Sequence, residues 1–288
     1  METQWPLVIF TLFVCVSCGL MAAEAALLLK GKGNKIMFPV LVVSAVALVI
    51  GGLGSFTHLQ HWERIFNGFG HITSGITQEL IGCVLMGIMM VIWFFFWYRK
   101  KEISKPVAIA SIIVPAAMVI ATAHSYLMPA RPAWTLLIVY YLGNAILLGS
   151  VFLWLITCFV KDKELAPTGA KMAFWGGVIG LVATVIYIIS LAVLNVWDFG
   201  YYADPTAMTT APTHVDSLIA VAVTGSGAAY FWVGIVTAVL VIICALLARK
   251  NASNGKVMSI VGLVCAMVTS VCLRIVIYIC AYTMYLMF

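Results

Sequence analysis

Apolar residues along this chain gather in eight runs that short polar stretches separate. The runs cover residues 5–29, 36–59, 76–98, 106–128, 133–160, 170–196, 225–248 and 257–285. A helix that crosses a bilayer needs roughly 20 mostly apolar residues, and each run is long enough. The pattern therefore predicts an all-α polytopic membrane bundle of eight transmembrane helices. We expect one integral membrane domain over residues 1–288, and a first run too long for a cleaved signal peptide.

Composition and charge support this fold class and orient it. With 64% hydrophobic and 9% charged residues, the chain is far more apolar than soluble domains, which average ~45–50%. Thirteen of the sixteen basic residues lie in the odd-numbered loops or, as Lys171 does, within two residues of one. The positive-inside rule then predicts cytoplasmic odd loops and both termini outside. Because the positive charge follows topology, we expect the lipid bilayer and no nucleic acid as a partner.

The cysteines do not indicate a metal centre. All eight fall within apolar runs, and only Cys15 and Cys18 have the CxxC spacing, which favours packing when it lies inside a membrane helix. No ferredoxin-type cysteine run occurs, so we expect any iron–sulfur cluster in another subunit. The histidines lie near the ends of the runs or in loops, so haem is not expected either.

Ionisable residues concentrate between Gly54 and Gly82, around the second loop. This stretch contains His58, His61, Glu63, Arg64, His71 and Glu79. Ionisable groups near hydrocarbon are costly and commonly functional. A functional site and an ordinary hydrated loop remain alternative interpretations. The longest connection, 195–224, is acidic and aromatic, and is either a docking surface for an extrinsic partner or a lid.

Three of the ionisable residues are predicted to share one depth in the membrane. His58 lies 23 residues from Lys35, Glu79 lies 20 from Arg99, and Arg274 lies 18 from Lys256. At ~1.5 Å per residue, all three lie about 27 to 35 Å from the basic loops, in the outer third of the bilayer.

Arg274 should face the interior of the bundle and find an acceptor there, because its charge is permanent. We expect it to approach Glu79, directly or through water, and Tyr278 to project from the same helix face. Glu24 lies six residues before Lys30. We expect its side chain to reach the interface or a lysine.

Several short motifs resemble those of a known family, the membrane anchor subunits of anaerobic dimethyl sulfoxide reductases. They are Trp5-Pro-Leu-Val-Ile-Phe-Thr-Leu-Phe13, His58-Leu59, Arg64-x-Phe66-Asn67, Glu79-Leu-Ile81 and Arg274-x-x-x-Tyr278. The resemblance implies a haem-free, non-catalytic anchor of anaerobic respiration that binds menaquinol near the outer face. It implies as partners a four-cluster iron–sulfur subunit and a molybdopterin catalytic subunit. The histidine and glutamate that match His58 and Glu79 are implicated in quinol binding in that family. Residues 60–63, Gln-His-Trp-Glu, depart from the Gly-Ser-Pro-like turn of the family.

Quinol oxidation releases two protons and two electrons, so the site needs proton acceptors. We assign His58 as the first acceptor and Glu79 as the relay, with Arg274 tuning Glu79. Arg64 would position the loop or the partner, and Tyr278 would extend the polar lining. Alternatives are an anchor of the polysulfide- or nitrite-reductase type, a haem-containing anchor, and a small-solute transporter.

Overall fold

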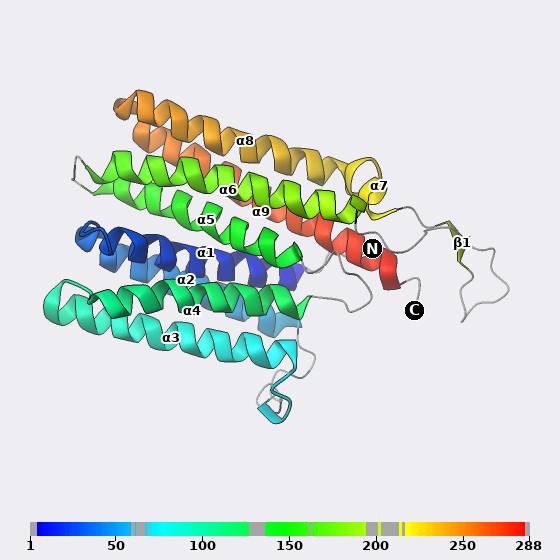
Figure 1. The fold of residues 1–288 in the computed structure, drawn as a ribbon, viewed down its shortest axis with the longest axis horizontal. Helices are drawn as coiled ribbons and strands as arrows, with labels where there is room; N and C mark the ends of the chain where they lie inside the picture. The colour runs from blue at the N-terminus through cyan, green and yellow to red at the C-terminus, as the bar shows by residue number, and fades with distance from the viewer. Residues whose placement is uncertain are drawn as a thin grey trace.

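A computed structural model describes most of the chain as a bundle of long helices (Figure 1). The described residues are 5–58, 61, 67, 69–126, 136–160, 162, 164–193, 201–202, 213–214 and 217–285. Their α-helices are α1 (Trp5–Leu28), α2 (Met37–His58), α3 (Gly75–Lys100), α4 (Lys105–Ser125), α5 (Leu137–Phe159), α6 (Leu165–Val193), α7 (Leu218–Val223), α8 (Ala228–Lys250) and α9 (Gly255–Tyr285). Short 3₁₀ turns, η1 (Asn34–Ile36) and η4 (Ala252–Asn254), precede α2 and α9.

Eight of these helices are long and apolar enough to cross a membrane, and they coincide with the eight predicted runs. The largest difference is at α6, which begins at Leu165 rather than at residue 170. Pro167 lies in its first turn, where a proline costs no hydrogen bond. The eight-helix membrane fold predicted from the sequence is therefore confirmed.

The long connection before α8 contains regular structure that its sequence did not indicate. Tyr201–Tyr202 (β1) pairs antiparallel with Thr213–His214 (β2). The six-residue helix α7 follows, and the Ser217 hydroxyl accepts a hydrogen bond from the Ala220 amide at its start. Both elements are too short for a hydrophobic period to reveal them.

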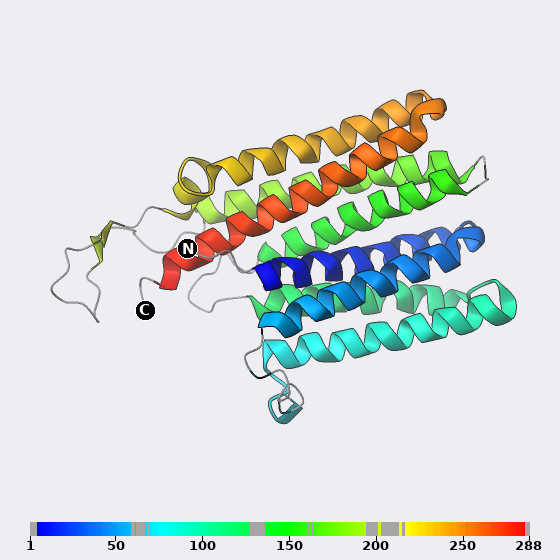
Figure 2. The ribbon, with the colours of Figure 1, turned by 180° about the vertical axis from the view of Figure 1, so that it is seen from behind.

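The long helices form two layers. In Figure 1, α6, α5, α1 and α4 lie towards the viewer, and Figure 2 shows α8, α9, α2 and α3 on the opposite side. α1 begins and α9 ends at the same end of the bundle, which we call the terminal end. The loops with most of the lysines and arginines lie at the other end, which we call the basic end.

The two halves of the chain pack their helices in the same order. In the first half, α1 packs against α2 and α4, and α3 packs against α2 and α4. In the second half, α5 packs against α6 and α9, and α8 packs against α6 and α9. The sequence shows no clear internal repeat, because helix packing requires matching shapes rather than matching residues. The arrangement is a parallel repeat of two four-helix units.

The two units meet mainly along α1 and α5. Gly19 and Gly149 lie at this joint, and a Cβ atom at either position would collide with the backbone of the opposite helix. Small residues allow such close backbone approach between membrane helices. The joint therefore depends on the absence of side chains at these two positions.

A pair of salt bridges also joins the two units at the basic end. Lys32 Nζ lies 3.3 Å from Glu164 Oε2, and Lys35 Nζ lies 2.8 Å from Asp162 Oδ2. The hydrogen bond from Lys35 lowers the pKa of Asp162 below its usual value. The two salt bridges thus join the loop between α1 and α2 to the loop between α5 and α6.

Candidate functional site

The structure places three of the five predicted site residues. Glu79, Arg274 and Tyr278 are described, and all three lie in the half of the bundle near the terminal end. His58 is the last residue of α2, but its side chain lies outside the described part, as does all of Arg64. The roles that the sequence assigns to His58 and Arg64 stay predictions.

Glu79 lies in the second turn of α3 and is nearly buried, with 9% of its surface exposed. Its carboxylate lies beside the Ser125 side chain at the end of α4. Gly75 allows this approach, since a Cβ there would lie 2.8 Å from Ser125 Oγ. Within the described residues, the buried Oε1 atom of Glu79 has no hydrogen-bond partner. A buried acceptor of this kind is costly unless a ligand, water or proton satisfies it.

Arg274 is fully buried, and its environment is complete. A guanidinium has five N–H donors, and five acceptors surround this one. They are Thr11 Oγ1 at 2.9 Å from Nε, Asn144 Oδ1 at 2.8 Å and Ser270 O at 3.1 Å from Nη1, and Thr11 O at 3.0 Å and Cys15 Sγ at 3.2 Å from Nη2. Asn144 is held in turn, because its Nδ2 donates to Ser270 Oγ at 2.8 Å. All five acceptors belong to neutral groups.

The predicted direct ion pair between Arg274 and Glu79 is absent, although both residues are described. Thr11, which bonds Arg274, and Glu79 lie about 9 Å and 6 Å from the starts of their helices at ~1.5 Å per residue, so the two sites are at similar heights along the bundle. The neighbours differ, however. α9 packs against α8, α5 and α1, whereas α3 packs against α4 and α2. The direct form of the predicted approach is therefore not seen, because a shared depth does not make two helices adjacent, and an approach through water stays a prediction.

A cluster of tyrosines, Tyr126, Tyr141 and Tyr278, connects the surroundings of the two charges. The Tyr126 ring stacks on Tyr141 with centroids 6.5 Å apart, and meets Tyr278 edge to face at 6.1 Å. Tyr126 directly follows Ser125, the neighbour of Glu79. At the other side, Arg274 Cζ lies 5.3 Å from the centre of the Tyr141 ring. The Tyr278 hydroxyl is buried beside Tyr126.

Sequence reasoning missed Tyr126, Tyr141 and Asn144. Asn144 carried a usable signal, because it is a lone amide in the middle of an apolar run and such residues usually hydrogen-bond between helices. The tyrosines carried a weaker one, since tyrosine near a membrane interface is common.

The other candidate ligands do not converge. In the part of the chain that the structure describes, no three His, Cys, Asp or Glu side chains come together in a possible metal site. Cys15 instead accepts a hydrogen bond from Arg274, which gives half of the CxxC pair a packing role. His71 and His124 are exposed.

Glu24 forms a second buried acidic site, close to the basic end. It was expected to reach a lysine or the interface, but it is fully buried, and neither carboxylate oxygen has a partner among the described residues. Gly33 covers it: a Cβ there would lie 2.7 Å from Oε1, and its φ of 99° favours glycine as well. The prediction was wrong because the chain folds back over the carboxylate after α1 ends.

Comparison with known proteins assigns no family and no function to these residues. No protein-family model matches the chain, and no curated protein matches it either.

Proposed function

We propose that the chain is the membrane anchor subunit of a quinol-dependent molybdopterin oxidoreductase of the dimethyl sulfoxide reductase type. In this proposal it oxidises menaquinol at the terminal end of the bundle. The electrons pass to a four-cluster iron–sulfur subunit and from there to the catalytic subunit. The motif resemblance and the eight-helix membrane fold support the proposal.

The observation that carries the proposal is the unpartnered Oε1 atom of Glu79, buried one to two turns inside the terminal end. A quinol hydroxyl is a donor of the kind that this acceptor lacks. α2, which ends with His58, packs against α3, the helix of Glu79. A hydroxylated ring could thus be held between two proton-accepting groups.

The bound quinol supplies two hydroxyl protons and two electrons. His58 takes the first proton, because imidazole has an unperturbed pKa of ~6.5 and binds protons reversibly near neutrality. Glu79 takes the second proton and passes it towards the water at the terminal end. Ser125 restrains the carboxylate.

Arg274 acts through the Tyr126–Tyr141–Tyr278 cluster rather than by direct contact. In this proposal its buried charge lies on one side of the cluster, and Ser125, the neighbour of Glu79, lies on the other. Tyr278 extends the polar lining, and Arg64 positions the second loop or the docked partner.

The orientation follows from the positive-inside rule, with the terminal end in the periplasm of a bacterial inner membrane. Protons released at Glu79 would then leave on that side. An anchor of the polysulfide- or nitrite-reductase type would use the same chemistry with a different terminal substrate.

Replacing His58 tests the proposal. Membranes containing the assembled complex with His58→Leu should lose menaquinol-driven reduction by about 100-fold or more, as expected when a proton acceptor is removed. Reduction driven by a viologen dye, which supplies electrons to the partner subunits directly, should be unchanged. His124→Leu, at an exposed histidine near the same end, is the matched control. Full quinol-driven activity in His58→Leu would refute the assignment.

A small-solute transporter is a second candidate, and the parallel repeat of two four-helix units favours it. Parallel repeats occur in several transporter folds, with sites near the membrane midplane between the repeats. Solute flux in proteoliposomes that contain this chain alone would support transport, and the anchor proposal expects none.

A further inference from the structure

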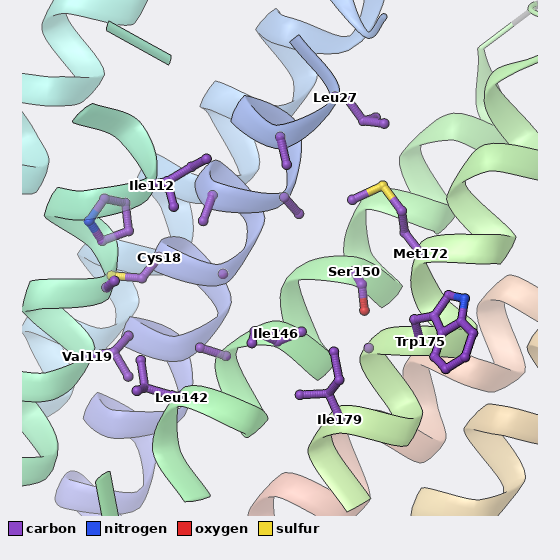
Figure 3. Close-up of a pocket in the computed structure, with 18 of the residues that line it drawn as sticks. Cys18, Leu27, Ile112, Val119, Leu142, Ile146, Ser150, Met172, Trp175 and Ile179 are labelled. Carbon is purple, nitrogen blue, oxygen red and sulfur yellow. The ribbon is translucent and has the colours of Figure 1, made fainter. Parts of the chain in front are cut away.

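A groove of about 630 Å³ runs along the face of the bundle shown in Figure 1, from the basic end to beyond the middle of the helices. α1 and α4 form one wall, and α5 and α6 form the other. Figure 3 shows Ile112 and Val119 on one side, and Met172, Trp175 and Ile179 facing them from the other. The groove lies away from Glu79, and what it binds is independent of the proposed quinol site.

Small residues create the groove. Ala22 and Ala23 lie on one turn of α1 and Ala26 on the next, and Ala116 follows Pro115 on α4. None of these side chains is long enough to close the space between the walls. Apart from Ser150, Thr168 and the lysines at its mouth, the lining is apolar or glycine, which suits a hydrocarbon chain better than a polar solute.

Three lysines, Lys30, Lys32 and Lys171, line the groove at the basic end. Lys32 also pairs with Glu164 at 3.3 Å. Lys30 and Lys171 are exposed and form no salt bridge with any described residue. An apolar groove therefore ends in positive charge that the described part of the chain does not neutralise.

We propose that this groove binds one anionic glycerophospholipid. Its phosphate lies between Lys30, Lys32 and Lys171, and one acyl chain lies along the alanine-lined floor. From Lys30 to Cys18 the groove follows α1 for twelve residues, or about 18 Å at ~1.5 Å per residue. This length matches one leaflet of a hydrocarbon core ~30 Å thick. A neutral quinone would leave the lysines unused, and free phosphate would leave the apolar walls unused.

The binding of two lipids that differ only in headgroup charge tests the proposal. The purified full-length chain in neutral detergent is titrated with phosphatidylglycerol and with phosphatidylcholine of identical acyl chains, and bound lipid is counted by native mass spectrometry. Each lysine near an anionic headgroup contributes about five-fold in affinity. Lys30→Gln combined with Lys171→Gln should therefore weaken phosphatidylglycerol binding roughly 30-fold. The control pair Lys105→Gln and Lys250→Gln removes two exposed lysines of the basic end that do not line the groove, and should change binding less than about two-fold.

A second pair of variants tests the walls. Ala116→Phe fills the groove and should reduce the binding of both lipids, whereas Ala117→Phe changes the exposed neighbouring residue, which does not line the groove, and should not. Equal binding of the two lipids by the unmodified chain would overturn the proposal. Competition by inorganic phosphate alone would overturn it in favour of a free anion. If a menaquinone analogue displaced the lipid, and the lysine variant bound lipid as well as the unmodified chain, the proposal would be overturned in favour of a quinone-tail site.

Discussion

Arg274 and Glu79 are two ionisable residues buried at similar depth, and the fold treats them in opposite ways. Five neutral acceptors from three helices satisfy every donor of Arg274. Glu79 keeps a buried oxygen without a partner among the described residues. A side chain with every hydrogen bond made is held in one position, whereas an unsatisfied one is available to a ligand or proton. The comparison separates a residue that organises the bundle from one suited to chemistry.

Removing the organising charge should have the largest effect. Arg274→Met leaves Asn144 Oδ1 without its donor, whereas the Thr11 and Ser270 carbonyl oxygens keep their helical hydrogen bonds. Because an orphaned buried acceptor costs about 1–3 kcal/mol, the variant should lose stability in this range. Thermal unfolding in detergent measures the loss, and Arg274→Lys, which keeps the charge and three donors, should lose less. Unchanged stability in Arg274→Met would remove the distinction between the two residues.

Glu79→Gln should show the reverse pattern. We expect stability within about 1 kcal/mol of the original, since no hydrogen bond of Oε1 is lost. Menaquinol-driven turnover of the assembled complex should fall about 100-fold, because an amide cannot accept the proton. Glu102→Gln, at an exposed carboxylate of the basic end, serves as the control. A complex with Glu79→Gln that turns over normally would show that the orphaned oxygen is not part of the reaction.

Glu24 extends the comparison to a buried carboxylate outside the proposed quinol site. Neither of its oxygens has a partner among the described residues, so Glu24→Leu removes a desolvated polar group without breaking a described hydrogen bond. We expect stability to rise by about 1 kcal/mol. A clear loss of stability, measured by the same thermal unfolding, would instead indicate that the carboxylate holds the turn at Gly33.

The exposed ion pair of Asp162 and Lys35 should have the smallest effect. The pKa of Asp162 is lowered in the fold, so the pair stabilises the protein above the ordinary value of 3.8 and loses this contribution as the pH falls through the lowered pKa. Asp162→Asn should therefore be slightly less stable than the original near neutral pH, and equal to it at the acid limit. Thermal unfolding at several pH values checks this, and a difference that grows on acidification would contradict it.

The sequence predicted the eight helices because hydrocarbon imposes length and composition on every span. It also predicted that Arg274 would be buried, since a permanent charge avoids lipid. It could not supply four of the five acceptors of Arg274, because these come from α1 and α5, far away in sequence. Counting residues from the basic loops predicted how deep each side chain lies in the membrane, but it gave no information on which helices are neighbours. The groove was not predicted from the sequence for the same reason, because alanines on α1 and α4 form a hollow only when the second unit packs beside them.

The contact between Gly19 and Gly149 has a consequence for the surroundings of Arg274. Cys15, which holds the guanidinium of Arg274, lies one turn of α1 from Gly19, which lines the groove. Because the two backbones touch there, a side chain added at Gly19 or Gly149 would displace the neighbouring turn of α1, including Cys15. The position of the buried guanidinium therefore depends on how closely the two four-helix units fit together.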